Sequence, residues 1–319
     1  MRRTALTLLI FLVAVLAGCG GDREGSDGDT DTGSGATSDL SGTITADGSS
    51  TVGPYTTAAA ERFRQENPDV RITVGVSGTG GGFERFCAGE TDLSNASRAI
   101  EEDEQQACES DGVEYTEFQI ANDALTVVVN KQNDWATCLT VDQLKTIWDQ
   151  GSKVKTWRDV DPEFPAESMT LYGAGTDSGT FDYFTDAING EEGRSRSDYS
   201  ATEDDNVTVQ GVSGDKGALG YFGFSYFEQN QETLKALEVD GGDGCVAPSV
   251  ESAQSGEYKP LSRPLYIYVK NEALARPEVA AFMRFMLDNE QPIAEASQFV
   301  PLTDEQLEKA KADLEAAAR

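Results

Sequence analysis

Residues 70–86 read VRITVGVSGTGGGFERF, and this stretch decides the fold class. Apolar residues alternate along 70–76, which is typical of a β-strand. Phe83 and Phe86 follow at helical spacing, so we expect a helix to begin there. Between them, residues 77–82 carry no acid, no base and almost no side chain. They predict a turn that leaves backbone N–H groups exposed.

Two other segments show the same order of strand end, small hydroxyl and glycine residues, and helix start. They are DGSST at 47–51 and DSGT at 177–180. A helix start carries unpaired N–H groups and partial positive charge, and glycine lets an anion approach the backbone. One such segment is common in α/β proteins. Three of them, each after a strand, predict a crevice that binds a tetrahedral oxyanion.

The rest of the chain alternates strands and helices, which indicates an α/β fold with largely parallel strands. The first part predicts a β-α-β-α-β unit: a strand in TITADGSST (43–51), a helix over 52–63, the strand at 70–76, the helix from Phe83 and an extended segment at 91–100. The later part predicts strands at 124–130, 169–175 and 263–270, helices at 140–151, 177–188 and in the C-terminal tail, and extended or mixed segments at 207–212 and 217–227.

Composition excludes several classes of function. The chain has 319 residues, enough for two lobes, and a formal net charge of −31. This excess of acid makes nucleic acid and anionic membrane surfaces poor partners. The absence of histidine excludes Ser-His-Asp and Cys-His nucleophiles and histidine-based zinc sites. No convergent metal-ligand spacing is present, so we expect neither a metal nor a cofactor.

The N-terminus has the pattern of an export signal. Two arginines precede a short apolar run, too short to span a bilayer, which ends in LAGC at 16–19. This order resembles a bacterial lipobox, so we expect residues 1–18 to be a lipoprotein signal peptide and Cys19 to be lipidated. An ordinary export signal with a chance cysteine is the alternative. Residues 19–41 are acidic and glycine-rich, and predict a disordered tether.

Four cysteines remain after Cys19, an even number that suggests two disulfides in an exported protein. Three pairings are open. We favour Cys87–Cys108, because it closes a short local loop, and Cys138–Cys245 then follows. The spacings are too wide for a CxxC metal or redox site.

Arg98 follows a predicted strand of the first unit and is a candidate charge partner for an oxyanion. Its planar guanidinium can bind a tetrahedral anion through two hydrogen bonds. On a chain this acidic, a salt bridge at the surface or between lobes explains the residue equally well. Both interpretations stay open on periodicity alone.

Several of these segments together resemble the phosphate-binding protein of bacterial Pst-type phosphate ABC importers. The similarity is carried by residues 47–100, by YGAGTDSGTFDYFTDAI (172–188) and by VQGVSGDKGALGYFGFSYF (209–227). The motifs stand in the order expected for that family, and the resemblance runs from about Ile44 to Leu287.

The resemblance implies a type II periplasmic-binding-protein fold, in which two α/β lobes are joined by two hinge crossovers and close on a ligand. Lobe I is expected to comprise 42–124 plus 262–319, and lobe II 125–261. The C-terminal helices would then pack back on lobe I.

The same resemblance implies a set of phosphate ligands, carried over motif by motif. These are Ser50, Thr51, Ser77, Gly78, Thr79, Ser178, Gly179 and Thr180, with Arg98 as the cation. The best-known members have an Asp where this chain has Arg98, and an Arg where it has Ala174. That Asp accepts the phosphate proton, so its loss leaves the selectivity against sulfate unexplained. Asp47 and Asp177 are the hypothesised replacements, although each also suits the start of a helix.

We therefore expect a receptor for inorganic phosphate and not an enzyme. The expected partners are two ABC permease subunits in the membrane and, behind them, a cytoplasmic ATPase pair. The expected location is the outer side of the cytoplasmic membrane, or the periplasm, with a lipid anchor on a monomeric protein. One rival is a receptor for another oxyanion, such as sulfate, molybdate or a phosphonate. The other is an exported phosphatase or carboxylate-dependent hydrolase, which would need a nucleophile or metal cluster near the glycine turn.

Overall fold

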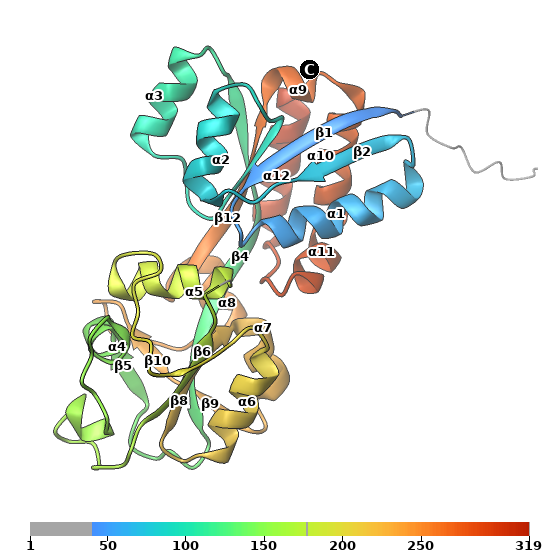
Figure 1. Cartoon of the computed structure of the whole chain (residues 1–319). Coiled ribbons are helices and arrows are strands. Elements are labelled where there is room, and N and C mark those ends of the chain that lie inside the picture. The colour runs from blue at the N-terminus through green and yellow to red at the C-terminus, as the bar shows by residue number, and fades with distance from the viewer. Residues whose placement is uncertain (1–39, 177, 319) are drawn as a thin grey trace, which may run out of the picture. The chain divides into compact units, whose positions relative to one another are not determined.

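Two long strands connect the two α/β lobes of the chain (Figure 1). β4 (Tyr115–Asn130) carries the chain from lobe I into lobe II, and β12 (Ser262–Lys270) brings it back. We call β4 and β12 the hinge strands. Two α/β lobes joined by two crossovers confirm the fold class expected from the sequence.

The computed structural model describes residues 40–176 and 178–318, which belong to one compact unit, Thr37–Arg319. The expected signal peptide, Cys19 and most of the tether lie outside the described residues, and so does Asp177. Within the described part of the chain, no helix combines the length and the apolar character needed to span a membrane.

β4 unites the main sheet by changing partners along its length. It pairs antiparallel with β12 up to Ala124, and from Leu125 it pairs antiparallel with β8. The strand order is β2-β1-β3-β12-β4-β8-β6-β7, with β9 also paired to β4, and a separate small sheet has the order β11-β10-β5. The bounds are β1 (Gly42–Gly48), β2 (Val70–Val74), β3 (Leu93–Ala96), β5 (Cys138–Thr140), β6 (Thr170–Ala174), β7 (Ser200–Thr202), β8 (Ala218–Gly223), β9 (Leu234–Ala236), β10 (Glu238–Asp240) and β11 (Cys245–Val246).

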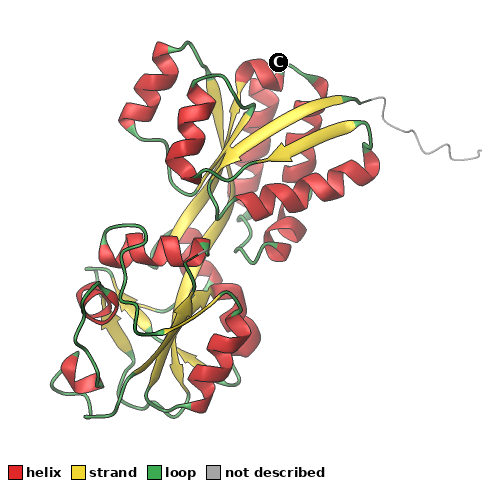
Figure 2. Cartoon of the chain, in the orientation of Figure 1, coloured by secondary structure: helices red, strands yellow, loops and turns green. Residues whose placement is uncertain are grey.

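Helices lie on both sides of the strands in each lobe (Figure 2). In lobe I they are α1 (Gly53–Glu66), α2 (Gly78–Cys87), α3 (Glu102–Ser110), α9 (Asn271–Leu274), α10 (Pro277–Asp288), α11 (Glu290–Ala296) and α12 (Asp304–Ala317). In lobe II they are α4 (Val141–Trp148), the short 3-10 helix η1 (Trp157–Asp159), α5 (Gly179–Phe184), the π-helix η2 (Thr185–Asn189), α6 (Asp205–Gly214), α7 (Phe224–Asn230) and α8 (Val250–Ser255).

Each lobe has its own main hydrophobic core. In lobe I, Ile44 of β1, Phe63 of α1 and Phe282 of α10 belong to one buried cluster, which also includes Leu314 of α12. The C-terminal helices therefore pack on lobe I, as expected. A second cluster in lobe II gathers around Trp148, whose ring meets three other aromatic rings edge-on. Apolar residues at strand and helix spacing form these two clusters because each element buries one face.

The glycine turn at 77–82 owes its composition to packing as well as to exposure. Gly78 has a φ of +80°, a conformation that residues with a Cβ rarely adopt. A Cβ at Gly82 would lie 2.5 Å from the Cα of Gly48, so glycine is needed there for α2 to touch the end of β1. This close approach brings the turn against the DGSST loop.

Four sequence expectations need correction. α2 begins at Gly78 and not at Phe83, so residues 78–82, expected as a turn before the helix, form its first residues. Residues 207–212 are not extended but lie in α6, where Thr208 and Val212, four residues apart, face the core, and Asp204 caps the first turn. Alternating valines imitated a strand there. The strands are also less parallel than expected, because both hinge strands run antiparallel to their neighbours. Finally, β4 starts at Tyr115, well before 124.

The structure pairs Cys87 with Cys108 and Cys138 with Cys245, the connectivity favoured above. The first disulfide joins the C-terminal part of α2 to α3 in lobe I. The second joins β5 to β11 in the small sheet of lobe II. Each lobe therefore carries its own covalent link, and neither disulfide crosses the hinge strands.

Candidate functional site

A polar cavity of about 140 Å³ lies where the ends of β1 and β3 meet α5 and the start of β12. Both lobes and one hinge strand contribute to its wall. The lining residues are Ser49, Ser50, Thr51, Gly78, Thr79, Gly80, Ser97, Arg98, Asp182, Tyr183, Asp186, Glu192 and Arg263. We call this space the anion cavity. Of the nine phosphate ligands expected from the sequence, it gathers Ser50, Thr51, Gly78, Thr79 and Arg98.

Ser178, Gly179 and Thr180 lie on the other side of the Ser50–Thr51 loop, in a neighbouring cavity of about 150 Å³. That cavity is also lined by Ser50 and Thr51. A Cβ at Gly179 would lie 2.9 Å from Thr51 Oγ1, so α5 begins in contact with this loop. The three strand-to-helix segments therefore converge on Ser50 and Thr51, although they do not all face one space.

Hydrogen bonds within the glycine turn occupy some of the expected donors. The Ser77 hydroxyl donates to Asp47 at 2.8 Å, and Ser77 lines neither cavity. Asp47 is buried, also pairs with Arg85, and lines neither cavity. Thr79 Oγ1 accepts the Ser97 N–H at 3.2 Å and lies 3.0 Å from the Ser97 hydroxyl. Asp47 therefore stabilises the glycine turn from outside both cavities, through its hydrogen bond with Ser77.

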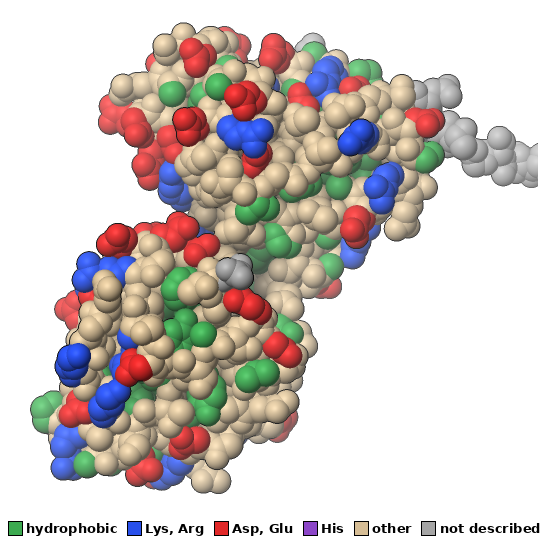
Figure 3. Space-filling model, viewed as in Figure 1, with side chains coloured by type: hydrophobic (Ala, Val, Ile, Leu, Met, Phe, Trp, Pro, Cys, Tyr) green, Lys and Arg blue, Asp and Glu red, His purple; other side chains and the backbone are tan. Residues whose placement is uncertain are grey.

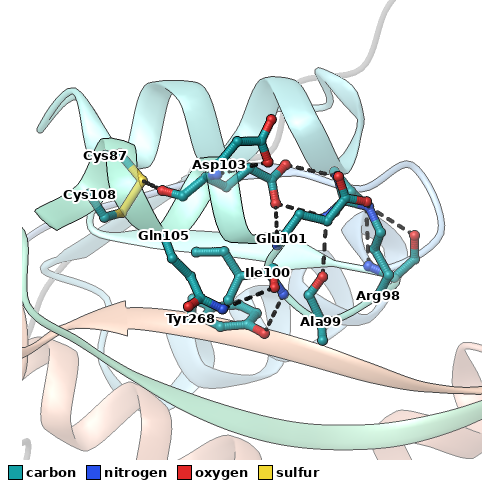
Figure 4. A network of polar contacts seen from close by, with 12 residues as sticks. Cys87, Arg98, Ala99, Ile100, Glu101, Asp103, Gln105, Cys108 and Tyr268 are labelled. Carbon is teal, nitrogen blue, oxygen red and sulfur yellow. Dashed lines mark hydrogen bonds and ion pairs between the residues drawn. A yellow bond between two sulfur atoms is a disulfide. The ribbon is translucent and has the colours of Figure 1, made fainter. Parts of the chain in front are cut away.

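Arg98 reaches the anion cavity but is held by two acids (Figure 4). Its Nη1 and Nη2 atoms donate to the Glu104 carboxylate, each at 2.8 Å, and Nε lies 3.1 Å from Glu101. Nη1 also donates to the Ala99 carbonyl at 3.1 Å. The hydrogen bond with Glu104 raises the pKa of Arg98 further. The salt-bridge interpretation and the cavity interpretation thus apply to the same side chain.

Arg263, at the start of β12, is a second cavity cation that the sequence analysis did not single out. Its Nε donates to Asp123 of β4 at 3.3 Å, and Nη2 donates to Thr51 Oγ1 at 3.1 Å. Its guanidinium carbon lies 3.5 Å from the ring centre of Tyr183, a close cation–π contact. Arg263 therefore touches lobe I, lobe II and the other hinge strand at once.

Three carboxylates line the lobe II side of the anion cavity: Asp182 of α5, Asp186 of the π-helix, and Glu192. Burial raises the pKa of Asp182, while the Ser50 hydroxyl and the Arg263 charge lower it. Burial, followed by the charges of Asp182 and Asp186, also raises the pKa of Glu192. Asp182 accepts a long hydrogen bond of 3.4 Å from Ser50. The sequence signal for Asp182 was its place in the first turn after SGT.

The wider surface is acidic, as the composition predicts. Figure 3 shows carboxylates gathered on lobe I over α3, which exposes Glu102, Asp103 and Glu109. Among residues 40–176 and 178–318, the group with metal-ligand geometry is Cys138, Glu238 and Cys245. Both of these cysteines are in a disulfide, so they offer no thiolate.

Comparisons with known proteins agree with this arrangement. A family model described as a PBP superfamily domain matches residues 33–290. The protein SphX of Synechococcus elongatus is 48% identical over 262 residues, which cover 81% of this chain and 77% of that protein. The phosphate-binding protein PstS of Staphylococcus saprophyticus is 40% identical over 298 residues, covering 93% and 88% respectively.

Among solved structures, a possible phosphate binding protein from Planctomyces limnophilus superposes with a TM-score of 0.85. It is 47% identical, and the match covers 88% of this chain and 100% of that one. The family model spans most of the chain, and both relatives are well above 30% identity over most of their length. The chain therefore belongs to the PBP superfamily and, within it, to the family of Pst-type phosphate-binding proteins.

Proposed function

We propose that this chain is an extracytoplasmic receptor that binds inorganic phosphate between its two lobes and delivers it to an ABC import permease. The observation that carries the proposal is the convergence of the three strand-to-helix segments on Ser50 and Thr51, beside a cavity that contains two arginines. The relatives named phosphate-binding protein support the choice of ligand.

Lobe I supplies most of the proposed hydrogen-bond donors. Ser50, Thr51, Gly78 and Thr79 offer hydroxyl and backbone N–H groups at the anion cavity. Ser178, Gly179 and Thr180 offer a second group of donors behind the same loop. We propose that the lobes, with boundaries near 124/125 and 261/262, close by bending at the hinge strands, so that both groups reach the anion. We assign the Ser77 hydroxyl to its hydrogen bond with Asp47, which stabilises the glycine turn, rather than to the ligand.

The group that accepts the phosphate proton is proposed to be Asp182. An acid in an anion site helps only a ligand that brings a proton, because a carboxylate repels an oxyanion without one. Asp182 lines the cavity and already contacts Ser50, whereas Asp47 is paired with Arg85 outside it. This assignment favours phosphate over sulfate, which carries no proton at neutral pH.

Lipid anchoring at Cys19, attachment to the outer side of the cytoplasmic membrane and action as a monomer complete the proposal. The LAGC order at 16–19 supports the anchor. The partners would be two permease subunits and their ATPase pair. Catalysis is not part of the proposal, because the cavity wall offers no histidine or cysteine nucleophile. Metabolic labelling of the full chain with a radioactive fatty acid, compared with Cys19→Ser, tests the anchor: equal labelling of both chains would contradict it.

Calorimetric titration of the ligand-stripped chain tests the central claim of this proposal. We expect one phosphate per chain, with no heat from sulfate in a separate run. Equal binding of both anions would make the chain a general oxyanion receptor. Binding of neither would limit the likeness to the fold. Turnover of a phosphomonoester that is lost in Ser178→Ala would support the exported phosphatase instead.

A further inference from the structure

The two cavity arginines have very different partners. Arg98 faces two carboxylates, Glu101 and Glu104, and both of its terminal nitrogens donate hydrogen bonds to Glu104. Arg263 forms one ion pair, with Asp123 and only through Nε, although its charge also acts on Asp182 and Glu192 across the cavity. Because a bidentate carboxylate satisfies the same guanidinium edge that an oxyanion would use, Glu104 competes directly with a ligand for Arg98.

The donor count points the same way. A guanidinium has five N–H groups. Arg98 donates three hydrogen bonds through Nη1 and Nη2, which leaves one N–H of that edge, and Nε lies against Glu101. For Arg263, no partner of Nη1 is found within residues 40–176 and 178–318, and Nη2 gives one bond, to Thr51. Three N–H groups of Arg263, a residue that lines the anion cavity, therefore have no hydrogen-bond partner among the described residues.

Arg263 is also held in place without losing these donors. Asp123 fixes its Nε end, and its guanidinium carbon lies 3.5 Å from the centre of the Tyr183 ring. Tyr183 is itself buried and donates its hydroxyl to the Pro260 carbonyl at 2.8 Å. Such a fixed fork loses little rotamer entropy on binding an anion.

The position of Arg263 in the sheet links the ligand to the hinge. Arg263 pairs in register with Asp123, one residue before the point where β4 leaves β12 for β8. The same side chain touches Thr51 of lobe I and Tyr183 of lobe II. An anion bound to the Arg263 guanidinium therefore contacts a side chain that already touches both lobes beside the hinge strands.

We propose that Arg263 is the principal cationic ligand of the bound anion, and that Arg98, held by Glu101 and Glu104, is a positioning residue that fixes the start of α3 beside the cavity. This inference rests on the proposed phosphate site and names the residue that gives it charge. It reverses the assignment that the sequence suggested, in which Arg98 was the cation.

The test compares phosphate binding of the full chain and its variants by calorimetry. We expect Arg263→Gln to weaken phosphate binding by about 100-fold or more, since two or more charge-assisted hydrogen bonds are lost. Arg98→Gln should weaken it by less than about 10-fold, and Arg194→Gln, which breaks an ion pair with Asp149 outside the cavity, should not change it. A larger loss in Arg98→Gln than in Arg263→Gln would overturn the proposal.

Two further variants separate binding from folding. Arg263→Gln leaves the Asp123 carboxylate buried and unpaired, so Asp123→Asn/Arg263→Gln removes the pair together. We expect the double variant to fold and still to lose phosphate. Asp123→Asn alone should keep phosphate binding within about 10-fold of the parent chain, because it removes a nearby negative charge but also weakens the contact that fixes the Nε end of Arg263. A purely structural ion pair would instead make both single variants equally harmful.

The outcomes distinguish this inference from the proposed function. If the parent chain binds phosphate and Arg263→Gln binds it equally well, only the inference is wrong. If the parent chain binds sulfate instead, the same variants are compared with sulfate, since the argument concerns any tetrahedral dianion. Binding of neither anion by the parent chain would overturn both.

Discussion

The two sides of the anion cavity are chemically opposite. The lobe I side presents hydroxyls, a glycine turn and Arg98, with its charge already matched by Glu101 and Glu104. The lobe II side presents the carboxylates Asp182, Asp186 and Glu192 beside the Tyr183 ring. Lobe I thus presents groups that suit any oxyanion, whereas the acids of lobe II suit one that can donate a proton. In the proposed function, lobe I binds the anion, lobe II selects phosphate, and Arg263 of the hinge strands contacts both lobes.

The largest expected effect comes from removing the selecting acid. Asp182→Asn turns an acceptor into a donor of similar size, so sulfate should bind and the phosphate-to-sulfate affinity ratio should fall by about 100-fold. Calorimetry with each anion measures the ratio. Asp47→Asn is the matched variant, because Asp47 lies outside the cavity; if it admitted sulfate while Asp182→Asn did not, the roles of the two acids would be exchanged.

A substitution that disturbs the packing of the glycine turn on the lobe I side should lower the stability of the fold. Gly82→Ala places a Cβ 2.5 Å from Gly48 Cα, which should lower the free energy of unfolding by about 1–3 kcal/mol in urea denaturation. Gly80→Ala, on the same helix, meets nothing closer than 3.7 Å and should stabilise the chain by about 0.5–1 kcal/mol. Equal effects from both variants would show that the contact between α2 and β1 is not tight.

The pH dependence of selectivity follows from the raised pKa of Asp182, whose main cause is burial. A raised folded pKa means that the carboxyl takes up its proton above pH 3.8, the ordinary value for Asp. Once protonated it donates to an anion, so sulfate binding should appear as the pH falls through that pKa and vanish as the pH rises again. Titrations from neutral to acid pH measure this. The same trend in Asp182→Asn would assign it to another group.

A smaller effect concerns stability in lobe I, away from the cavity. Burial raises the pKa of Glu290 to about 7, while the Leu302 N–H bound to its carboxylate lowers it. Because the pKa of Glu290 is raised in the folded chain, protonation of this carboxyl stabilises the fold. This contribution to the free energy of unfolding is complete below pH 4.5, the ordinary pKa of Glu, and is lost as the pH rises through about 7.

Glu290→Gln should therefore raise the midpoint of thermal unfolding by about 2–4 °C at pH 8 and leave it nearly unchanged at pH 4. Scanning calorimetry at the two values checks this. The exposed Glu308→Gln serves as control, because the charge of Glu308 is not among the causes that shift the pKa of Glu290. A gain of equal size at both pH values would point to packing instead of ionisation.

The sequence located residues on the lobe I side of the cavity but none of the three acids on the lobe II side, for a physical reason. The predicted residues on the lobe I side lie where a strand is followed by a helix, and they are Ser50, Thr51, Gly78 and Thr79. The local composition of such segments can be recognised without knowledge of tertiary contacts. Asp182 lies in a turn of the same kind, but its role depends on Ser50, which is 132 residues away. Long-range contacts of this sort leave no local pattern.

The two arginines show the same limit. Glu101 and Glu104, which hold Arg98, form the capping box of α3. The ion pairs of Arg98 could therefore have been predicted from the acidic residues 101–104 that follow it. Arg263 stands in a plain strand, and only its pairing with Asp123 across the hinge reveals it. The hinge register is a property of the folded sheet, and the strand of 115–123 was itself missed.

A crystal structure of the phosphate complex would show which arginine and which acid contact the anion. We expect one phosphate in the anion cavity, within hydrogen-bond distance of Thr51, the glycine turn and Arg263, with the Asp182 carboxylate facing one phosphate oxygen and Arg98 still paired with Glu104. A phosphate bound by Arg98 after Glu104 has moved away, with Arg263 and Asp182 out of contact, would contradict this expectation.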